Sequence, residues 1–243
     1  MTTAQWQAVL AAPPVEARAW LGLAAQAGHA GAQALLGQWL LDGRGTDQPR
    51  PREAFDWFMQ SARQGHDMAM NMVGRCYENG WGVSAVPEEA TRWFRQAASR
   101  GLDAGIYNLA NQYAAGRGVP RNDGQAFNLY ARAAAMGHAK SSTKAGRYHE
   151  DGIGVPRNAD QARDCYRIGA EGGDFRGQFH YARLLAARGD AEGALHWLQQ
   201  VPQTATAAFL EEAAAVLAQI EDPRFRALGL AMGEQAVRKR QDR

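Results

Sequence analysis

The sequence predicts an all-α fold, a right-handed α/α superhelical solenoid with capping helices at its ends. Three observations predict it. A glycine returns at a nearly constant interval, at Gly28, Gly65, Gly101, Gly137 and Gly173, with spacings of 37, 36, 36 and 36 residues. The segments between these glycines repeat one two-helix pattern, and the terminal segments depart from it. A supersecondary unit repeated at such a period is typical of solenoids, in which each unit packs on its neighbours.

Because stacked units form one continuous body, we expect the 243 residues to make a single solenoid domain. It would contain N-terminal helices over 1–28, repeat helical pairs over 29–201 and C-terminal capping helices over 202–243. Residues 14–28 match only the second helix of a unit, so a further helix is expected before them. The capping helices are expected near 204–220 and 223–240, separated by Asp222 and Pro223.

The first helix of each unit is predicted to carry a small residue at its centre. The aligned residues are Gly37, Gly74, Ala110, Gly146 and Ala182. A glycine inside a helix costs about 1 kcal/mol relative to alanine. Its return at one position therefore predicts a packing role, because a small residue lets two helices approach closely.

A Gly-x-Gly turn is expected between the two helices of a unit. Its glycines are Gly43 and Gly45, Gly80 and Gly82, Gly116 and Gly118, and Gly152 and Gly154. The first glycine of each pair is well placed to end a helix in the left-handed conformation. A phosphate-binding loop would need a preceding strand or a Gly-Lys-Ser/Thr ending, and the sequence has neither. The fifth unit is four residues shorter and lacks the second glycine.

The second helices are predicted to begin at capping signals. Proline stands at the first helical position at Pro51 and Pro87, where it suits a helix start. Asn158 precedes Gln161 by three residues, the spacing of a capping box, and Asn122 has the same relation to a glutamine.

The repeated positions also resemble a known family. One unit carries Ala69, Val73, Gly74, Tyr77, Gly80, Gly82, Val83, Glu89, Ala90, Trp93, Ala97, Ala98 and Gly101, and this run recurs 36 residues later. Over about residues 14–200 the chain resembles the Sel-one-like repeat family, a relative of the tetratricopeptide repeats. The resemblance implies an α/α superhelix that acts as an adaptor for protein or peptide partners, in a bacterial regulatory or assembly role. Trp93 is expected to be buried between adjacent units.

Composition narrows the function classes. The net charge of +2 is too small to favour nucleic-acid binding through overall electrostatic attraction. A protein that scaffolds RNA would need more basic residues. Cys76 and Cys165 fall in different repeats, so two free thiols are expected. The start of the sequence lacks the features of a signal peptide, and no segment is long and apolar enough to predict a membrane span. Both observations favour a cytoplasmic protein. A monomer is favoured.

Catalytic and metal-binding patterns are missing from the sequence. His29, His66 and His138 fall at one repeat position, too far apart to share a zinc ion, and no serine lies in a nucleophile elbow. We expect no enzyme and no cofactor. The alternative is a hydrolase of the cysteine-rich Sel-one-like type, which would act on cell-wall or antibiotic amides. Those relatives pair cysteines within repeats, and this chain does not.

A polar ladder is the candidate binding site. Directly after the central small residue come Gln38, Arg75, Asn111, Arg147 and Arg183, and three residues earlier come Leu35, Met72, Asn108, Lys144 and His180. In tetratricopeptide-like superhelices the first helices line the concave face. The predicted partner-binding residues there are Asn71, Arg75, Asn108, Asn111, Lys144, Arg147, His180 and Arg183. Arginine binds carboxylates bidentately, so the partner is expected to be acidic or to present a terminal carboxylate. A solvated face with salt bridges to Glu78 or Glu150 is the alternative, which the sequence leaves open.

Overall fold

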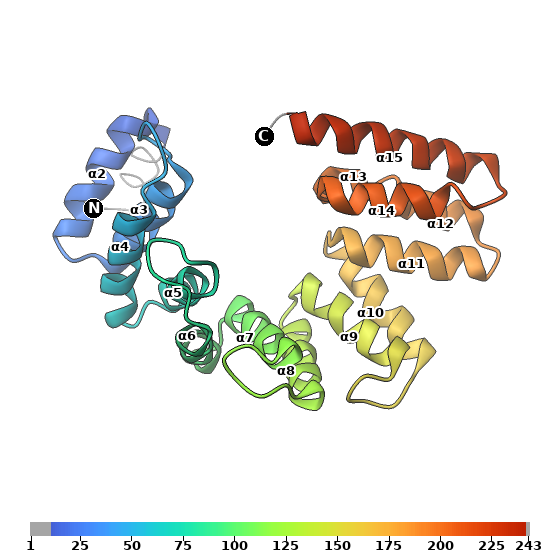
Figure 1. Ribbon diagram of the computed structural model, residues 1–243, viewed down its shortest axis with the longest axis horizontal. Helices are drawn as coiled ribbons and strands as arrows, with labels where there is room; N and C mark the ends of the chain where they lie inside the picture. The colour runs from blue at the N-terminus through green and yellow to red at the C-terminus, as the bar shows by residue number, and fades with distance from the viewer. Residues whose placement is uncertain (1–10, 242–243) are drawn as a thin grey trace. The chain divides into compact units, whose positions relative to one another are not determined.

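The computed structural model describes residues 11–241, and within this range every regular element is a helix (Figure 1). The all-α prediction is confirmed. The chain divides into two compact units, residues 1–122 and 123–243. That the chain forms one continuous solenoid domain stays a prediction. The further helix expected before residue 14 falls on residues 1–10, outside the described residues.

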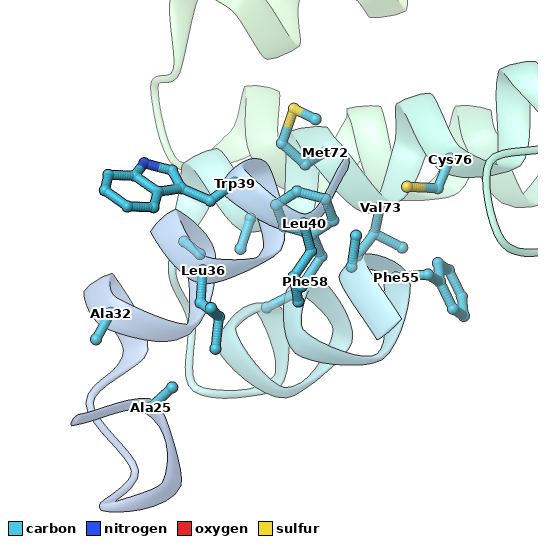
Figure 2. Packing of buried hydrophobic residues seen from close by; sticks show 14 of the residues in the cluster. Ala25, Ala32, Leu36, Trp39, Leu40, Phe55, Phe58, Met72, Val73 and Cys76 are labelled. Carbon is cyan, nitrogen blue, oxygen red and sulfur yellow. The ribbon is translucent and has the colours of Figure 1, made fainter. Parts of the chain in front are cut away.

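Within residues 14–115, the first unit consists of successive helices of 13 residues each. They are α2 (Pro14–Gln26), α3 (Ala30–Asp42), α4 (Pro51–Arg63), α5 (Asp67–Asn79), α6 (Pro87–Ser99) and α7 (Asp103–Ala115). Each helix packs against the next one along the chain, as the repeated two-helix pattern predicts (Figure 1). Figure 2 shows the core of this unit, in which Phe58 of α4 lies among Leu36 and Leu40 of α3 and Val73 of α5.

The second unit continues the pattern and then leaves it. Its helices are α8 (Asp123–Ala135), α9 (Ala139–Asp151), α10 (Ala159–Glu171), α11 (Phe175–Ala187), α12 (Ala191–Leu198), the single turn α13 (Val201–Thr204), α14 (Ala207–Leu217) and α15 (Pro223–Gln241). Helix α12 is the shortened second helix of the fifth unit, and Asp190 caps it by accepting a hydrogen bond from the Gly193 amide at 2.9 Å. The two expected capping helices correspond to α14 and α15.

The central glycines make room for an aromatic ring. A Cβ added to Gly74 would lie 2.6 Å from the ring of Phe94, which is fully buried in the facing helix α6. Gly37 with Phe58 and Gly146 with Tyr166 repeat the arrangement, at 2.8 and 2.9 Å. The predicted packing role is confirmed, and the structure supplies its cause: the second helix of the same unit inserts a ring where the first has no side chain.

The two glycines of each turn have different structural roles. Gly80 ends α5 in the left-handed conformation, with φ of 74°, and Gly43, Gly116 and Gly152 do the same for their helices, as predicted. Gly82 is also left-handed, but a Cβ there would lie 2.1 Å from the carbonyl oxygen of Pro51. The second glycine therefore lets the turn lie against the start of the preceding unit's second helix.

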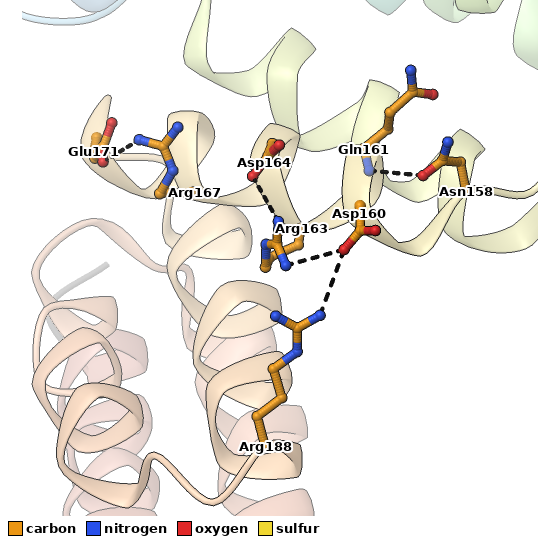
Figure 3. A network of polar contacts seen from close by, with 8 residues as sticks. All are labelled: Asn158, Asp160, Gln161, Arg163, Asp164, Arg167, Glu171 and Arg188. Atoms are coloured by element: carbon orange, nitrogen blue, oxygen red, sulfur yellow. Dashed lines mark hydrogen bonds and ion pairs between the residues drawn. The ribbon is translucent and has the colours of Figure 1, made fainter.

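The predicted helix starts are also observed. Helices α4 and α6 begin at Pro51 and Pro87. The side chain of Asn158 accepts a hydrogen bond from the Gln161 amide at 3.0 Å, which confirms this capping box (Figure 3). Trp93 is 8% exposed, so its predicted burial is confirmed.

The exposed face of α10 is covered by short-range ion pairs. Arg163 pairs with Asp160 at 3.1 Å and Arg167 with Glu171 at 2.8 Å (Figure 3). Arg188, at the end of α11, reaches Asp160 at 3.6 Å. Each of these arginines has a carboxylate partner on α10 itself.

Candidate functional site

In the first unit, the ladder residues are engaged with the protein itself. The guanidinium of Arg75 lies over the ring of Trp81, 4.9 Å from its centroid. Asn71 is 4% exposed and accepts a hydrogen bond from the Asn108 side chain at 2.8 Å. Asn71 thereby braces α5 against α7, and it holds the half-buried Asn108 in place. Asn111 is half-buried on α7.

Glu78, near this part of the ladder, is engaged by residues that do not belong to the ladder. It accepts a hydrogen bond from Gln112 at 2.8 Å and pairs with Arg117 at 3.2 Å. Sequence reasoning named Glu78 as a salt-bridge partner for the ladder. The cation that the structure places on it is Arg117, which comes from the turn after α7.

In the second unit, the ladder residues lie on two helices that contact each other. Lys144 and Arg147 come from α9, and His180 and Arg183 from α11. Arg147 is exposed and pairs with Asp151 on its own helix at 3.3 Å. Arg183 pairs with Glu150 of α9 and so ties the two helices together.

Glu150 is the centre of a small network. Besides Arg183, it accepts a hydrogen bond from the Tyr166 hydroxyl at 2.6 Å. Partial burial opposes the ionised form, but the hydrogen bonds from Tyr166 and Arg183 outweigh it, so the pKa of Glu150 lies below its usual value. His180 stacks on Tyr166 with the ring centroids 4.8 Å apart. Burial first, and then the nearby Arg183, lower the pKa of His180 below its usual value, which favours the neutral imidazole.

A cavity of about 360 Å³ opens beside this network, between α9, α11 and α14. Its polar lining includes Arg147, Arg176 and His180, and Phe179, Phe209 and Val216 supply apolar lining. Glu212 of α14 is an acidic residue on its wall. The cavity thus joins a basic wall on α9 and α11 to an apolar wall, which is the lining expected for a carboxylate next to an apolar group.

Arg176 is the residue that sequence reasoning missed. Its guanidinium lies 4.4 Å from the ring centroid of Phe175 and 5.7 Å from that of Phe209. It makes no ion pair within residues 11–241. Arg176 precedes Arg183 by seven residues and so shares its helix face, and extending the ladder by one more turn would have found it. The sequence gives no comparable signal for the α14 residues that line the cavity, because this helix lies outside the repeat.

Lys144 of α9 lies near the two arginines of the basic wall. Burial lowers the pKa of Lys144, and the cations Arg147 and Arg176 lower it further. Only Asp174 acts in the opposite direction. Asp174 is itself buried, and its Oδ1 accepts no hydrogen bond from the described residues. Lys144, Arg147 and Arg176, here called the basic cluster, therefore repel one another.

Between residues 11 and 241, no group of three His, Cys, Asp or Glu side chains is placed to hold a metal ion. Cys76 and Cys165 are both free, and burial raises the pKa of the Cys76 thiol to about 12, which keeps it protonated and inert. Within the same range no helix is long and apolar enough to span a bilayer.

Comparison with known proteins decides the family. The Sel1 repeat model matches residues 14–29, 30–66, 67–102, 104–138 and 139–174, well over half of the chain. The chain belongs to the Sel1 repeat family. The predicted resemblance is confirmed, and the matched segments end before the shortened fifth unit, where the sequence pattern also departs. Sel1 repeats generally serve as protein-interaction modules.

Solved structures share the fold of this Sel1 repeat protein. A Sel1 repeat protein from Oxalobacter formigenes is 23% identical, with 97% of this chain and 100% of the other covered and a TM-score of 0.83. The protective antigen c5321 of uropathogenic Escherichia coli is 25% identical, with 93% of this chain and 49% of the other covered and a TM-score of 0.68. Immunity protein Pa5087 from Pseudomonas aeruginosa is 17% identical, with 96% and 81% covered and a TM-score of 0.54. No curated protein matches the chain.

Proposed function

We propose that this Sel1 repeat protein is a non-catalytic adaptor, and that it binds a segment of a partner protein at the cavity between α9, α11 and α14. The segment would carry a carboxylate, from an acidic side chain or a free C-terminus, next to an apolar side chain. The observation that carries the proposal is Arg176, a cation that stacks on aromatic rings at the cavity wall and makes no ion pair within residues 11–241.

The basic cluster would supply the affinity for the carboxylate. Arginine holds a carboxylate through two parallel charge-assisted hydrogen bonds, and the aromatic ring beneath Arg176 limits the number of rotamers that binding must fix. Arg147 is already paired with Asp151, but that pair is exposed and exchanges at little cost. The carboxylate would also offset the repulsion that the free protein carries at Lys144.

The apolar wall would supply selectivity. Phe179 and Phe209 pack edge to face, 5.5 Å between centroids, and leave room for an aliphatic or aromatic side chain. Glu212 lies on the same wall and would repel a second carboxylate. We therefore expect a segment with one carboxylate beside an apolar residue, rather than a run of acidic residues.

Selection from a random peptide library tests this chemistry directly. The library is displayed with free C-termini, and the selected peptides are titrated by fluorescence anisotropy. Arg147→Ala and Arg176→Ala should each weaken binding by about 1–3 kcal/mol, since each removes a charge-assisted contact. Added salt should weaken the wild-type complex.

Arg167→Ala is the matched control. Arg167 is a partly exposed arginine of the same unit that also has an i,i+4 carboxylate partner, Glu171, but it lies on α10 and does not line the cavity. This variant should bind the peptides as the wild type does. If the Arg147→Ala, Arg176→Ala double variant also binds with unchanged affinity, the cavity is not the binding site. If the selected peptides lack a carboxylate, the proposed chemistry is wrong.

A further inference from the structure

A second cavity lies on the other side of α14, along α15. It has a volume of about 510 Å³ and is lined by Ala214, Ala218, Arg226, Gly229, Leu230, Gly233, Glu234 and Val237. We call this surface the α14–α15 groove. It belongs to neither the repeats nor the basic cluster, and an inference from it goes beyond the proposed adaptor function.

The groove is an apolar hollow with exposed apolar side chains at its edge. Glycines and alanines form its floor: Gly229 lies so close to α14 that an added Cβ would reach the Leu217 Cβ at 3.0 Å. At its edge, Leu230 is 73% exposed and Val237 is 54% exposed. Isolated exposed leucines are ordinary, but here the exposed side chain borders an apolar hollow of matching character. A surface that carries both a protruding side chain and a hollow of matching character can pair with a copy of itself.

The charges on the groove are also self-complementary. Arg226, Leu230 and Glu234 are spaced by four residues, so they lie on one face of α15 with Leu230 in the middle. If two copies of α15 lie antiparallel with a two-fold axis at Leu230, Arg226 of each copy faces Glu234 of the other. The two leucines then meet at the axis, where each enters the hollow of the opposite copy.

Both charges are available for such a contact. Arg226 makes no ion pair within residues 11–241. Glu234 pairs with Arg238 at 3.4 Å, but both side chains are more than two-thirds exposed, so this pair is readily exchanged. An acidic or a basic partner would attract one of these two charges and repel the other. A second copy of the chain instead forms two Arg226–Glu234 pairs, one on each side of the central leucine.

We propose that two copies of this chain associate through the α14–α15 groove as an antiparallel, two-fold symmetric dimer. This proposal departs from the monomer expected from the sequence, and the groove lies outside the repeats. Because the contact is a single helix pair with its floor, it is a small interface, and the dissociation constant should lie in the micromolar range.

Sedimentation equilibrium over about 1–200 µM, a range chosen for micromolar affinity, measures the dimer directly against the 26.5 kDa monomer. Leu230→Glu places a charge at the axis and should weaken the dimer about tenfold or more. Leu23→Glu is the control, because Leu23 is 59% exposed on α2 and distant in sequence from the groove. It should leave dimerisation unchanged. Circular dichroism checks that both variants remain helical.

A charge swap tests the antiparallel register. Arg226→Glu and Glu234→Arg should each weaken the dimer, because like charges then face each other. The double variant restores opposite charges across the interface and should recover the wild-type dissociation constant. A wild type that stays monomeric over the whole range overturns the proposal. So does a dimer that survives Leu230→Glu, or a double variant no better than the single ones.

Discussion

The second glycine of the turn after α5 offers a quantitative test of how successive units pack. Gly80 and Gly82 lie two residues apart, and both are left-handed, with φ of 74° and 71°. A Cβ on Gly80 would meet no atom nearer than 3.7 Å, which is an ordinary contact. A Cβ on Gly82 would lie 2.1 Å from the carbonyl oxygen of Pro51 and 2.8 Å from the Cα of Arg52. Alanine at Gly80 therefore tests the strain of the left-handed backbone alone. Alanine at Gly82 tests this strain together with the close contact to α4.

The two costs can be worked out separately. Alanine in the left-handed conformation costs about 1–2 kcal/mol, and Gly80→Ala should show this cost alone. At Gly82 the overlap is with backbone, so it is relieved only when the turn moves away from α4. Overpacking of this kind adds about 1–3 kcal/mol. We therefore expect Gly80→Ala to lower the free energy of unfolding by about 1–2 kcal/mol and Gly82→Ala by about 2–5 kcal/mol.

Urea unfolding with tryptophan fluorescence measures both variants, because Trp57, Trp81 and Trp93 all lie in the same compact unit. Repeat arrays can unfold in parts, so amide hydrogen exchange is needed to locate the loss. Protection should fall at the start of α4 in Gly82→Ala and stay unchanged there in Gly80→Ala. Equal destabilisation of the two variants would refute the claim that the turn lies on α4.

Other predictions follow from single side chains. Trp93→Ala should cost about 3–5 kcal/mol through an internal cavity, with hydrogen-exchange protection lost first around α6; unchanged protection there would contradict its burial. Asn158→Ala should cost about 0.5–2 kcal/mol by uncapping α10, measured as a shift in urea midpoint. A thiol reagent should modify the half-buried Cys165 of the folded protein before Cys76, and rapid labelling of Cys76 would mean that its helix opens readily. Lys144→Met should stabilise the protein at pH 7, because the unfolded chain holds this proton more tightly than the folded one. The gain should shrink at pH values above the folded pKa of Lys144, and a variant that is less stable at pH 7 would contradict this reading.

The helices could be predicted from the sequence because their signals are local. A proline at a helix start, an asparagine three residues before a glutamine and a glycine at a helix end act within one turn of chain, and Pro51, Asn158 and Gly80 all behave as expected. The function of Gly82 could not be predicted in the same way. It depends on the carbonyl oxygen of Pro51, 31 residues earlier, which only the packed structure brings near.

The candidate site shows the same division. Register alone correctly placed Lys144 and Arg147 on one helix and His180 and Arg183 on a helix that contacts it. The sequence offers Glu150 as a salt-bridge partner for the ladder, and the structure pairs it with Arg183. Which ladder arginine reaches Glu150 depends on the spacing between helices and could not be predicted. The contribution of Phe209 was also out of reach, because α14 carries no repeat signal.

The energetics of the basic cluster bear on why the protein keeps it. Lys144 is half-buried beside Arg147 and Arg176, and burial first and then these neighbours oppose its charge, while Asp174 favours it less strongly. We therefore expect the lysine to reduce the stability of the free protein relative to an apolar side chain, which Lys144→Met tests. Residues that break a local rule without a structural gain are expected at functional sites. A bound carboxylate would reverse the sign of the local interaction, because the three cations that repel one another would all be attracted to it. The stability lost in the free protein would then return as binding energy, which makes the stability cost at Lys144 an argument for a ligand.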